Sequence, residues 1–188
     1  MLAALAPTLA FPFGRDQATF AYMAQTILRG EMPYRDAWEV KPPGIYLLYS
    51  LVLAAAPQPG SEMLLVRLAD CAVALGIAVL LARILAHLGR PEAGPAAALF
   101  YAALYLQGSY WSLAQAESWA NLLVLMLVWI VLSPARKGQP LAVGLLLGGI
   151  TGLKFTSLLP TLPFVWLTLR VREPGWPGRG GALLLGCI

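Results

Sequence analysis

The sequence predicts an all-α, polytopic membrane protein, and three observations support this fold class. Hydrophobic residues make up 59% of the 188 residues, and charged residues only 12%. The mean hydropathy is +0.71, whereas a soluble domain carries about 25% charged residues. Long apolar runs alternate with small groups of cations. The net charge of +4 therefore indicates membrane topology and no nucleic-acid partner.

The N-terminal region predicts the end of one span and then a loop outside the cytoplasm. Residues 1–13 are apolar but shorter than the roughly 20 residues that a spanning helix needs, so we expect the second half of a span or a late translation start. Residues 14–61 form the loop. Within it, residues 16–29 predict an amphipathic interfacial helix, since apolar residues recur at helical spacing. Asp16 is the expected N-cap and Gly30 the residue that ends the helix.

The rest of the loop predicts a rigid segment followed by a short helix. Residues 30–43 contain three prolines and a glycine, which favours an ordered loop. Residues 44–56 are too few for a full span, so an interfacial or re-entrant helix is expected. Membrane helices are predicted beyond the loop at residues 62–88, 94–111, 117–133, 141–156 and 158–170, the last two being a broken pair. Residues 181–188 begin a further span and stop within it, so the chain is expected to be part of a longer protein.

The cations predict the orientation. Seven of the 13 lysine and arginine residues fall in three groups between the apolar segments: Arg83 and Arg90; Arg136 and Lys137; and Arg170, Arg172 and Arg179. All three groups lie on one side of the predicted spans, which the positive-inside rule makes cytoplasmic. The loop from Asp16 to Lys41, the turn from Tyr110 to Glu117, and Lys154 then meet on the opposite face. Their convergence marks the candidate site.

We interpret several tyrosine, tryptophan and cysteine residues and the single histidine as structural residues, not as site residues. We interpret four aromatic residues on the site's face as an interfacial belt, with sugar stacking as the alternative: Tyr105, Tyr110, Trp111 and Trp119. Cys71 and Cys187 lie in apolar runs and predict packing roles, not a disulfide. His87 is the only histidine, which excludes a site with several histidine ligands.

One stretch carries a resemblance to a known family. The string RDQ-x(2)-FAY-x(4)-IL-x-GE-x-PYRDAW-x(2)-KPPGIYLLY resembles the first extracytoplasmic loop of the GT-C glycosyltransferases. The nearest resemblance is to the bacterial family related to protein O-mannosyltransferases and to the aminoarabinose transferase of lipid A. Arg67, the pair Ala116–Glu117 and the segment GLLLGGITGLKF agree with it. The resemblance covers essentially the whole chain, as the N-terminal half of such an enzyme.

The resemblance implies a GT-C-type bundle in the bacterial inner membrane, with the loop facing the periplasm. It implies inverting transfer of a sugar from a polyprenyl-phosphate donor to a lipid, glycan or protein acceptor outside the cytoplasm. The family's loop usually begins with two adjacent acids, whereas here the second position is Gln17. Asp16 is then the only acid at that position that could act as the base.

Such a reaction needs a carboxylate that takes the acceptor's proton and cations that stabilise the departing phosphate. Asp16 is the candidate general base, with helix capping as the alternative. Lys41 is the first candidate for binding the donor phosphate, because Pro42 and Pro43 hold the backbone beside it; the alternative is snorkelling. Lys154 is the second candidate, since it stands alone in an apolar stretch.

Three further acids are candidates for an acceptor or metal site: Asp36, Glu39 and Glu117. Oxygen ligands suit Mg²⁺ or Mn²⁺, and Glu39 is the first candidate ligand. Asp36 could instead pair with Arg35 in a turn, and Glu117 could instead cap a helix.

Two predictions remain. Arg67 and Asp70 are three residues apart on one helix, so a structural ion pair is expected. The competing class for the whole chain is a non-catalytic polytopic membrane protein, either a transporter fragment or an inactive truncated relative. A transporter predicts matching broken helices in two halves, and only the pair near residue 154 is visible.

Overall fold

The computed structural model describes residues 5–56, 60–108, 110–134 and 137–170, and in these ranges the chain is helical without a β-strand. The α-helices are α2 (Arg15–Leu28), α3 (Gly44–Ala54), α4 (Glu62–His87), α5 (Ala93–Gln107), α6 (Ala116–Leu132), α7 (Gln139–Lys154) and α8 (Leu162–Arg170). Three short 3₁₀ helices join them: η1 (Ala6–Ala10), η2 (Tyr110–Ser112) and η3 (Phe155–Thr161). The all-α prediction is confirmed for these residues.

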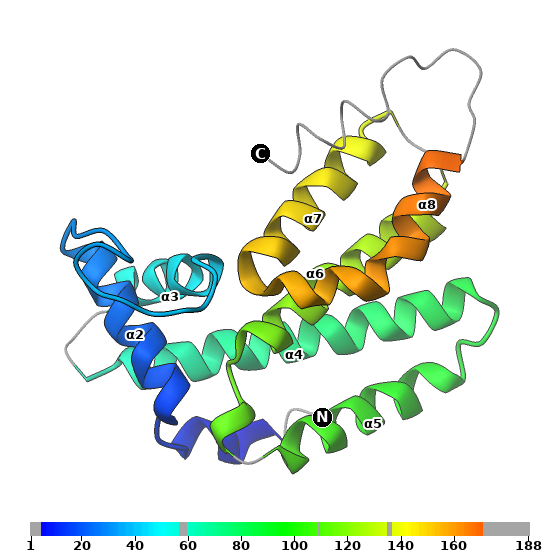
Figure 1. Cartoon of the computed structure of the whole chain (residues 1–188). Helices are drawn as coiled ribbons and strands as arrows, with labels where there is room; N and C mark the ends of the chain where they lie inside the picture. The colour runs from blue at the N-terminus through cyan, green and yellow to red at the C-terminus, as the bar shows by residue number, and fades with distance from the viewer. Residues whose placement is uncertain (1–4, 57–59, 109, 135–136, 171–188) are drawn as a thin grey trace.

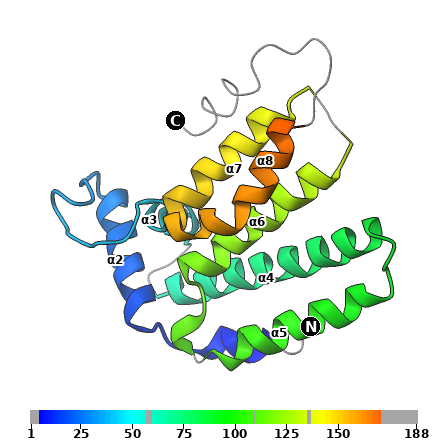
Figure 2. The same ribbon diagram turned by 45° about the vertical axis from the view of Figure 1, so that its right-hand side comes forward.

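The helices form two groups around α4 and α6. Helix α5 runs back along α4, and α6 crosses α4 on another side (Figure 1). Helices α7 and α8 lie side by side against α6 (Figure 2), while α2 and α3 pack on each other next to the beginning of α4. The ends of α3, α6 and α7 therefore approach one another, and this junction positions the candidate site.

By length and composition, two helical segments are long and apolar enough to cross a membrane: Glu62–His87 and Gln139–Trp166, which contain 18-residue windows of mean hydropathy 2.3 and 1.6. The second is bent, because Lys154 has an extended backbone with φ −160° and ψ 104°. The chain reverses there and α8 returns beside α7 (Figures 1 and 2). The predicted break near residue 154 is thus confirmed, while α5 and α6 have only 15 and 17 residues.

Helix α2 follows the predicted amphipathic helix with two differences. Phe20, Met23 and Ala24 are fully buried, as the apolar stripe predicts. Leu28, at the end of the stripe, is instead 48% exposed. Gly30 follows the helix with φ +80°, a conformation that glycine adopts without strain. The N-cap prediction for Asp16 is wrong: Gly14 is the N-cap, and Asp16 lies in the first turn.

The main core lies between α2, α3 and the beginning of α6. Phe20 contacts Tyr49 edge to face at 5.5 Å between ring centroids, and Tyr49 lies 5.9 Å from Trp119. A second buried cluster joins α6 to α7 through Leu127, Val143 and Ile150.

Several predictions concern the two ends of the chain and the cations that were predicted to be cytoplasmic. Helix η1 and an extended segment occupy the described part of residues 1–13. The predicted span at residues 181–188 lies outside the described residues, as do Arg136, Arg172, Arg179 and Cys187.

Candidate functional site

The first element of the site is an ion pair between the beginning of α2 and the loop that follows this helix. Lys41 Nζ lies 2.6 Å from Asp16 Oδ2, and the side chains are 33% and 47% exposed. The same ammonium lies over the ring of Phe20, 4.5 Å from its centroid. The candidate base and the candidate phosphate-binding cation are therefore direct neighbours, at a place that solvent and ligand can reach.

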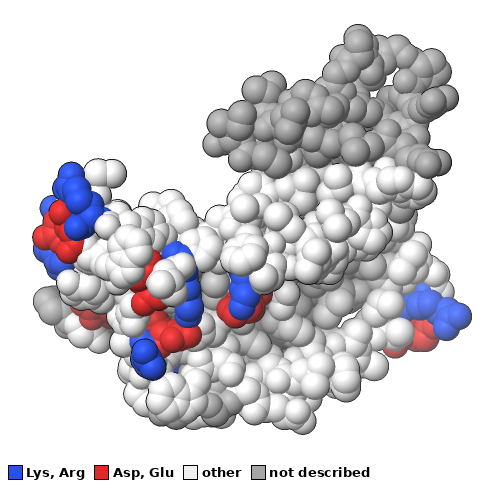
Figure 3. Space-filling model, viewed as in Figure 1, with Lys and Arg blue, Asp and Glu red and all other residues white. Residues whose placement is uncertain are grey.

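The second element is an ion pair between Glu117, in the first turn of α6, and Lys154, at the end of α7. Both side chains are partly exposed. Lys41 also acts electrostatically on Glu117, which connects this pair to the first one. The structure thus brings together the three segments that were predicted to converge. In Figure 3 their charges form small adjacent groups of opposite sign, surrounded by uncharged surface.

A wide apolar groove of about 560 Å³ begins beside these charges. Pro43 and Gly44 line it two and three positions after Lys41, and Gly152 and Leu153 line it immediately before Lys154. Its other walls come from α3, α4 and α6, including Trp119 at the beginning of α6. The volume falls in the range of about 300–1,000 Å³ typical of ligand sites. Charged groups and an apolar channel therefore lie together.

The loop before Lys41 is internally hydrogen bonded. Asp36 accepts a hydrogen bond from the Met32 amide at 2.8 Å and forms two contacts with Arg35, at 2.6 and 2.9 Å. The Arg35 guanidinium and the Met32 amide lower the pKa of Asp36 to about 2. Asp36 therefore holds a turn, as the structural alternative predicted, and its carboxylate is engaged away from the Asp16–Lys41 pair.

The metal site predicted at Glu39 and Asp36 stays a prediction; both carboxylates contact groups of their own loop. Glu39 Oε1 accepts a hydrogen bond from the neighbouring Val40 amide at 2.9 Å. In the described parts of the chain, no three His, Cys, Asp or Glu side chains gather where they could share a metal ion. Asp36 is already engaged with Arg35. No reaction step below is assigned to a divalent cation.

The turn before α6 is held by buried polar groups from three helices, α2, α3 and α4. Ala114 has a left-handed backbone, with φ +52°. Its amide donates to Asp70 Oδ2 at 3.0 Å, and its carbonyl accepts from the Tyr49 hydroxyl at 2.8 Å. The Gln17 amide nitrogen donates to the carbonyls of Leu113 and Trp111. These contacts fix where α6 begins, and therefore where Glu117 is placed.

The prediction that Arg67 and Asp70 pair is wrong. Arg67 donates instead to the carbonyls of Phe11 and Pro12, at 3.4 and 2.7 Å. Asp70 accepts from the Tyr105 hydroxyl, from Ala114 and, at 3.1 Å, from Trp119 Nε1. The two side chains are three positions apart, but each has partners on other segments that the helix spacing could not reveal.

The aromatic-belt prediction is wrong for two of the four residues, and it stays a prediction for Trp111 and Tyr110. Trp111 is 52% exposed, as a belt requires. Trp119 is only 7% exposed, and both it and Tyr105 hydrogen bond to the buried Asp70, so these two belong to the interior. The side chain of Tyr110 lies outside the described part of the chain.

Sequence reasoning missed Tyr34, Tyr46, Asp70 and Gln17 as residues that organise the site. Tyr34 and Tyr46 both donate to the carbonyl of Lys41, at 2.6 and 3.2 Å. Tyr34 stands inside the motif PYRDAW, so its position in a charged, proline-rich loop was an available signal. Gln17 carried a signal too, as the amide that replaces an expected acid.

Comparisons with protein-family models, curated proteins and solved structures find no match to this chain.

Proposed function

We propose that this chain is the donor-binding part of a polytopic membrane glycosyltransferase. In this proposal the enzyme transfers a sugar from a polyprenyl-phosphate carrier to a lipid, glycan or protein acceptor, with inversion at the anomeric carbon. The observation that carries the proposal is the position of two lysines beside the apolar groove: Pro43 and Gly44, shortly after Lys41, and Leu153, next to Lys154, line the groove itself. A lipid phosphate presents that combination of an anionic head and an apolar chain.

The groove suits an isoprenoid chain because its lining is almost wholly aliphatic. Leu47, Leu48, Val73, Leu122 and Leu123 contribute to it, together with glycines of α7 that leave room between the helices. Each buried methylene of a lipid chain contributes about 0.8 kcal/mol when it leaves water. The lysines contribute charge, and an ammonium is a common phosphate partner.

The chemistry assigned to the ion pairs is a direct displacement. The acceptor oxygen attacks the anomeric carbon, its proton passes to Asp16, and the bond from that carbon to the phosphate oxygen breaks with its electron pair on the phosphate. Lys41 and Lys154 stabilise the departing phosphate. In the free protein Lys41 contacts Asp16 at 2.6 Å, so the donor phosphate competes with Asp16 for this cation and releases the carboxylate to act as a base.

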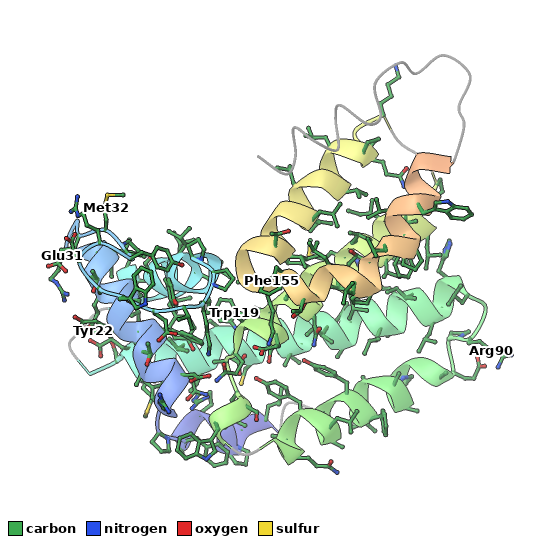
Figure 4. All side chains as sticks on the ribbon, in the orientation of Figure 1. Tyr22, Glu31, Met32, Arg90, Trp119 and Phe155 are labelled. Carbon is green, nitrogen blue, oxygen red and sulfur yellow. The ribbon has the colours of Figure 1, made fainter. Side chains whose placement is uncertain are left out.

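Membrane placement follows the two apolar segments and the distribution of charge. Arg90 lies at the far end of α4 from the ion pairs (Figure 4), and Arg83 belongs to the same end. The positive-inside rule would put that end in the cytoplasm and the site on the outer face. The proposal therefore includes a bacterial inner membrane, with the site facing the periplasm.

The first experiment measures transfer from a radiolabelled polyprenyl-phosphate sugar by the full-length protein, with donor binding measured separately. Asp16→Asn should lower kcat by about 10²- to 10⁴-fold, the usual loss for a positioned base, while the donor still binds. Lys41→Ala should weaken donor binding as well as turnover, and Lys41→Arg should restore part of both. Lys137→Ala is the matched control, an exposed cation away from the groove.

The second experiment blocks the groove. Gly152 lines it, and a Cβ at this position would meet no atom within 4 Å, so Gly152→Leu places its side chain in open space. Binding of the long-chain donor should weaken, while a short, soluble sugar-phosphate analogue should bind as before. Normal turnover by Asp16→Asn together with unchanged donor binding by Lys41→Ala would reject the transferase, and a non-catalytic membrane protein would then be the better reading.

A further inference from the structure

Two tyrosine hydroxyls meet at the main chain of Lys41. Tyr34, from the loop, donates to the Lys41 carbonyl at 2.6 Å, and Tyr46, from α3, donates to the same oxygen at 3.2 Å. Immediately after Lys41, Pro42 and Pro43 restrict the backbone. The Lys41 main chain is therefore held from both directions, although its side chain is only partly buried.

Tyr34 adopts a backbone conformation that a bulky side chain rarely takes. Its φ is +68°, in the left-handed region that favours glycine and asparagine. Strain of this kind persists only where the surroundings compensate it, and it is often found at functional sites. The compensation here is visible: the Tyr34 amide donates to Ala37 at 2.7 Å, and the ring contacts Trp38 and Tyr46 at 6.0 and 6.2 Å between centroids.

The strained backbone directs the Tyr34 hydroxyl back toward Lys41, seven positions along the chain. Partial burial and the nearby Glu39 carboxylate raise the pKa of Tyr34 above its usual value. The hydroxyl therefore keeps its proton, which it needs in order to donate. The contacts of Asp36 with Met32 and Arg35 already stabilise the turn of this loop. The turn by itself therefore does not require an aromatic residue with a positive φ at position 34.

We propose that Tyr34 is a positioning residue that holds the main chain of Lys41, so that the Lys41 ammonium reaches the donor phosphate and Asp16. The inference rests on the proposed function, in which Lys41 binds that phosphate. A lysine side chain loses considerable freedom when its ammonium is confined to one place. Holding the Lys41 backbone in place before binding removes part of this entropic cost. The affinity for a ligand that contacts the ammonium is therefore higher.

The test measures binding of a polyprenyl phosphate without sugar to the full-length protein in lipid nanodiscs. Tyr34→Phe keeps the ring and its contacts but removes the hydroxyl, and it should weaken binding about 2- to 10-fold, the usual range for one hydrogen bond. Tyr46→Phe should act in the same direction. Tyr22→Phe is the control, because Tyr22 is an exposed tyrosine on α2 (Figure 4) whose hydroxyl does not contact Lys41.

A double-mutant cycle separates positioning from a merely structural role. If Tyr34 acts through Lys41, Tyr34→Phe should cause no further loss of affinity once Lys41→Ala is present. Effects that multiply would overturn the inference, as would unchanged affinity of Tyr34→Phe in the wild-type background. In both of those outcomes the proposed function survives, provided that Lys41→Ala alone weakens binding. Unchanged binding by Lys41→Ala would overturn the proposed function and this inference together.

Discussion

The substitution Gly44→Ala tests the crossing of α3 over α7, which places the two ion pairs next to each other. Gly44 is the first residue of α3 and faces the main chain of Gly152 in α7. A Cβ at position 44 would lie 2.5 Å from the Gly152 carbonyl oxygen and 2.6 Å from its carbon. Both are backbone atoms, so no side chain can rotate away to make room.

The structure sets the size of the expected effect. Side-chain Cβ atoms essentially never come within 3.0 Å of such neighbours, so the two helices must separate by at least about 0.5 Å. Overpacking of this kind costs about 1–3 kcal/mol, whereas replacing glycine by alanine returns about 0.4–1 kcal/mol through the unfolded chain. The middle values of these two ranges give an expected net loss of about 1.3 kcal/mol in the free energy of unfolding.

The assay is thermal or denaturant unfolding of the full-length protein in detergent, combined with donor binding. Gly152→Ala is the matched control, because it changes the other partner of the same crossing and its Cβ would meet nothing within 4 Å. That variant should be as stable as the wild type or gain up to about 1 kcal/mol of helix propensity. Gly44→Ala should also weaken donor binding, since it displaces the chain between Lys41 and Lys154.

Two results would refute the reasoning. Full stability of Gly44→Ala would show that α3 does not approach α7 as closely as described. An equal loss in Gly152→Ala would show that any added methyl group disturbs this region, whichever helix carries it.

Three other predictions follow from the described contacts. A cysteine in place of Arg35 should react with a membrane-impermeant thiol reagent from outside, and one in place of Lys137 should not; the reverse pattern would end the orientation and the site assignment. The contribution of Asp36 to stability should be complete above its unfolded pKa near 4 and be lost as the pH falls through about 2; an NMR titration midpoint near 4 would remove the Arg35 contact. Asp70→Asn should cost about 1–3 kcal/mol of unfolding free energy, because one amide oxygen cannot serve three donors, with altered Trp119 fluorescence; a variant as stable as the wild type would contradict the network.

The secondary structure of the region before α4 could be predicted because its signals are local. The apolar spacing of α2, the glycine at its end and the short apolar run of α3 each specify a helix or a break within a few residues. The reversal at Lys154 was also local, since polar and proline residues interrupt an apolar stretch. The length of α5 was less predictable, because apolar composition continues beyond the residue at which the helix ends.

The residues of the candidate site could be predicted from the sequence, but their pairing could not. Scarcity of charge in an apolar chain pointed to Asp16, Lys41, Glu117 and Lys154, and topology predicted that they share a face. Which acid pairs with which lysine depends on how α2, α6 and α7 pack, and residues 25 and 37 positions apart make those two contacts. No sequence spacing encodes such a distance.

The sequence by itself therefore determined where charges interrupt the apolar chain and which segments become helical, because hydrophobic spacing, prolines and glycines act over a few residues. Only the tertiary structure decided that Asp70 binds Tyr105, Ala114 and Trp119 in place of Arg67, and that two tyrosines hold Lys41. The physical reason is that a buried polar group must find a partner among whatever groups packing brings within about 3 Å. Those groups come from distant parts of the chain.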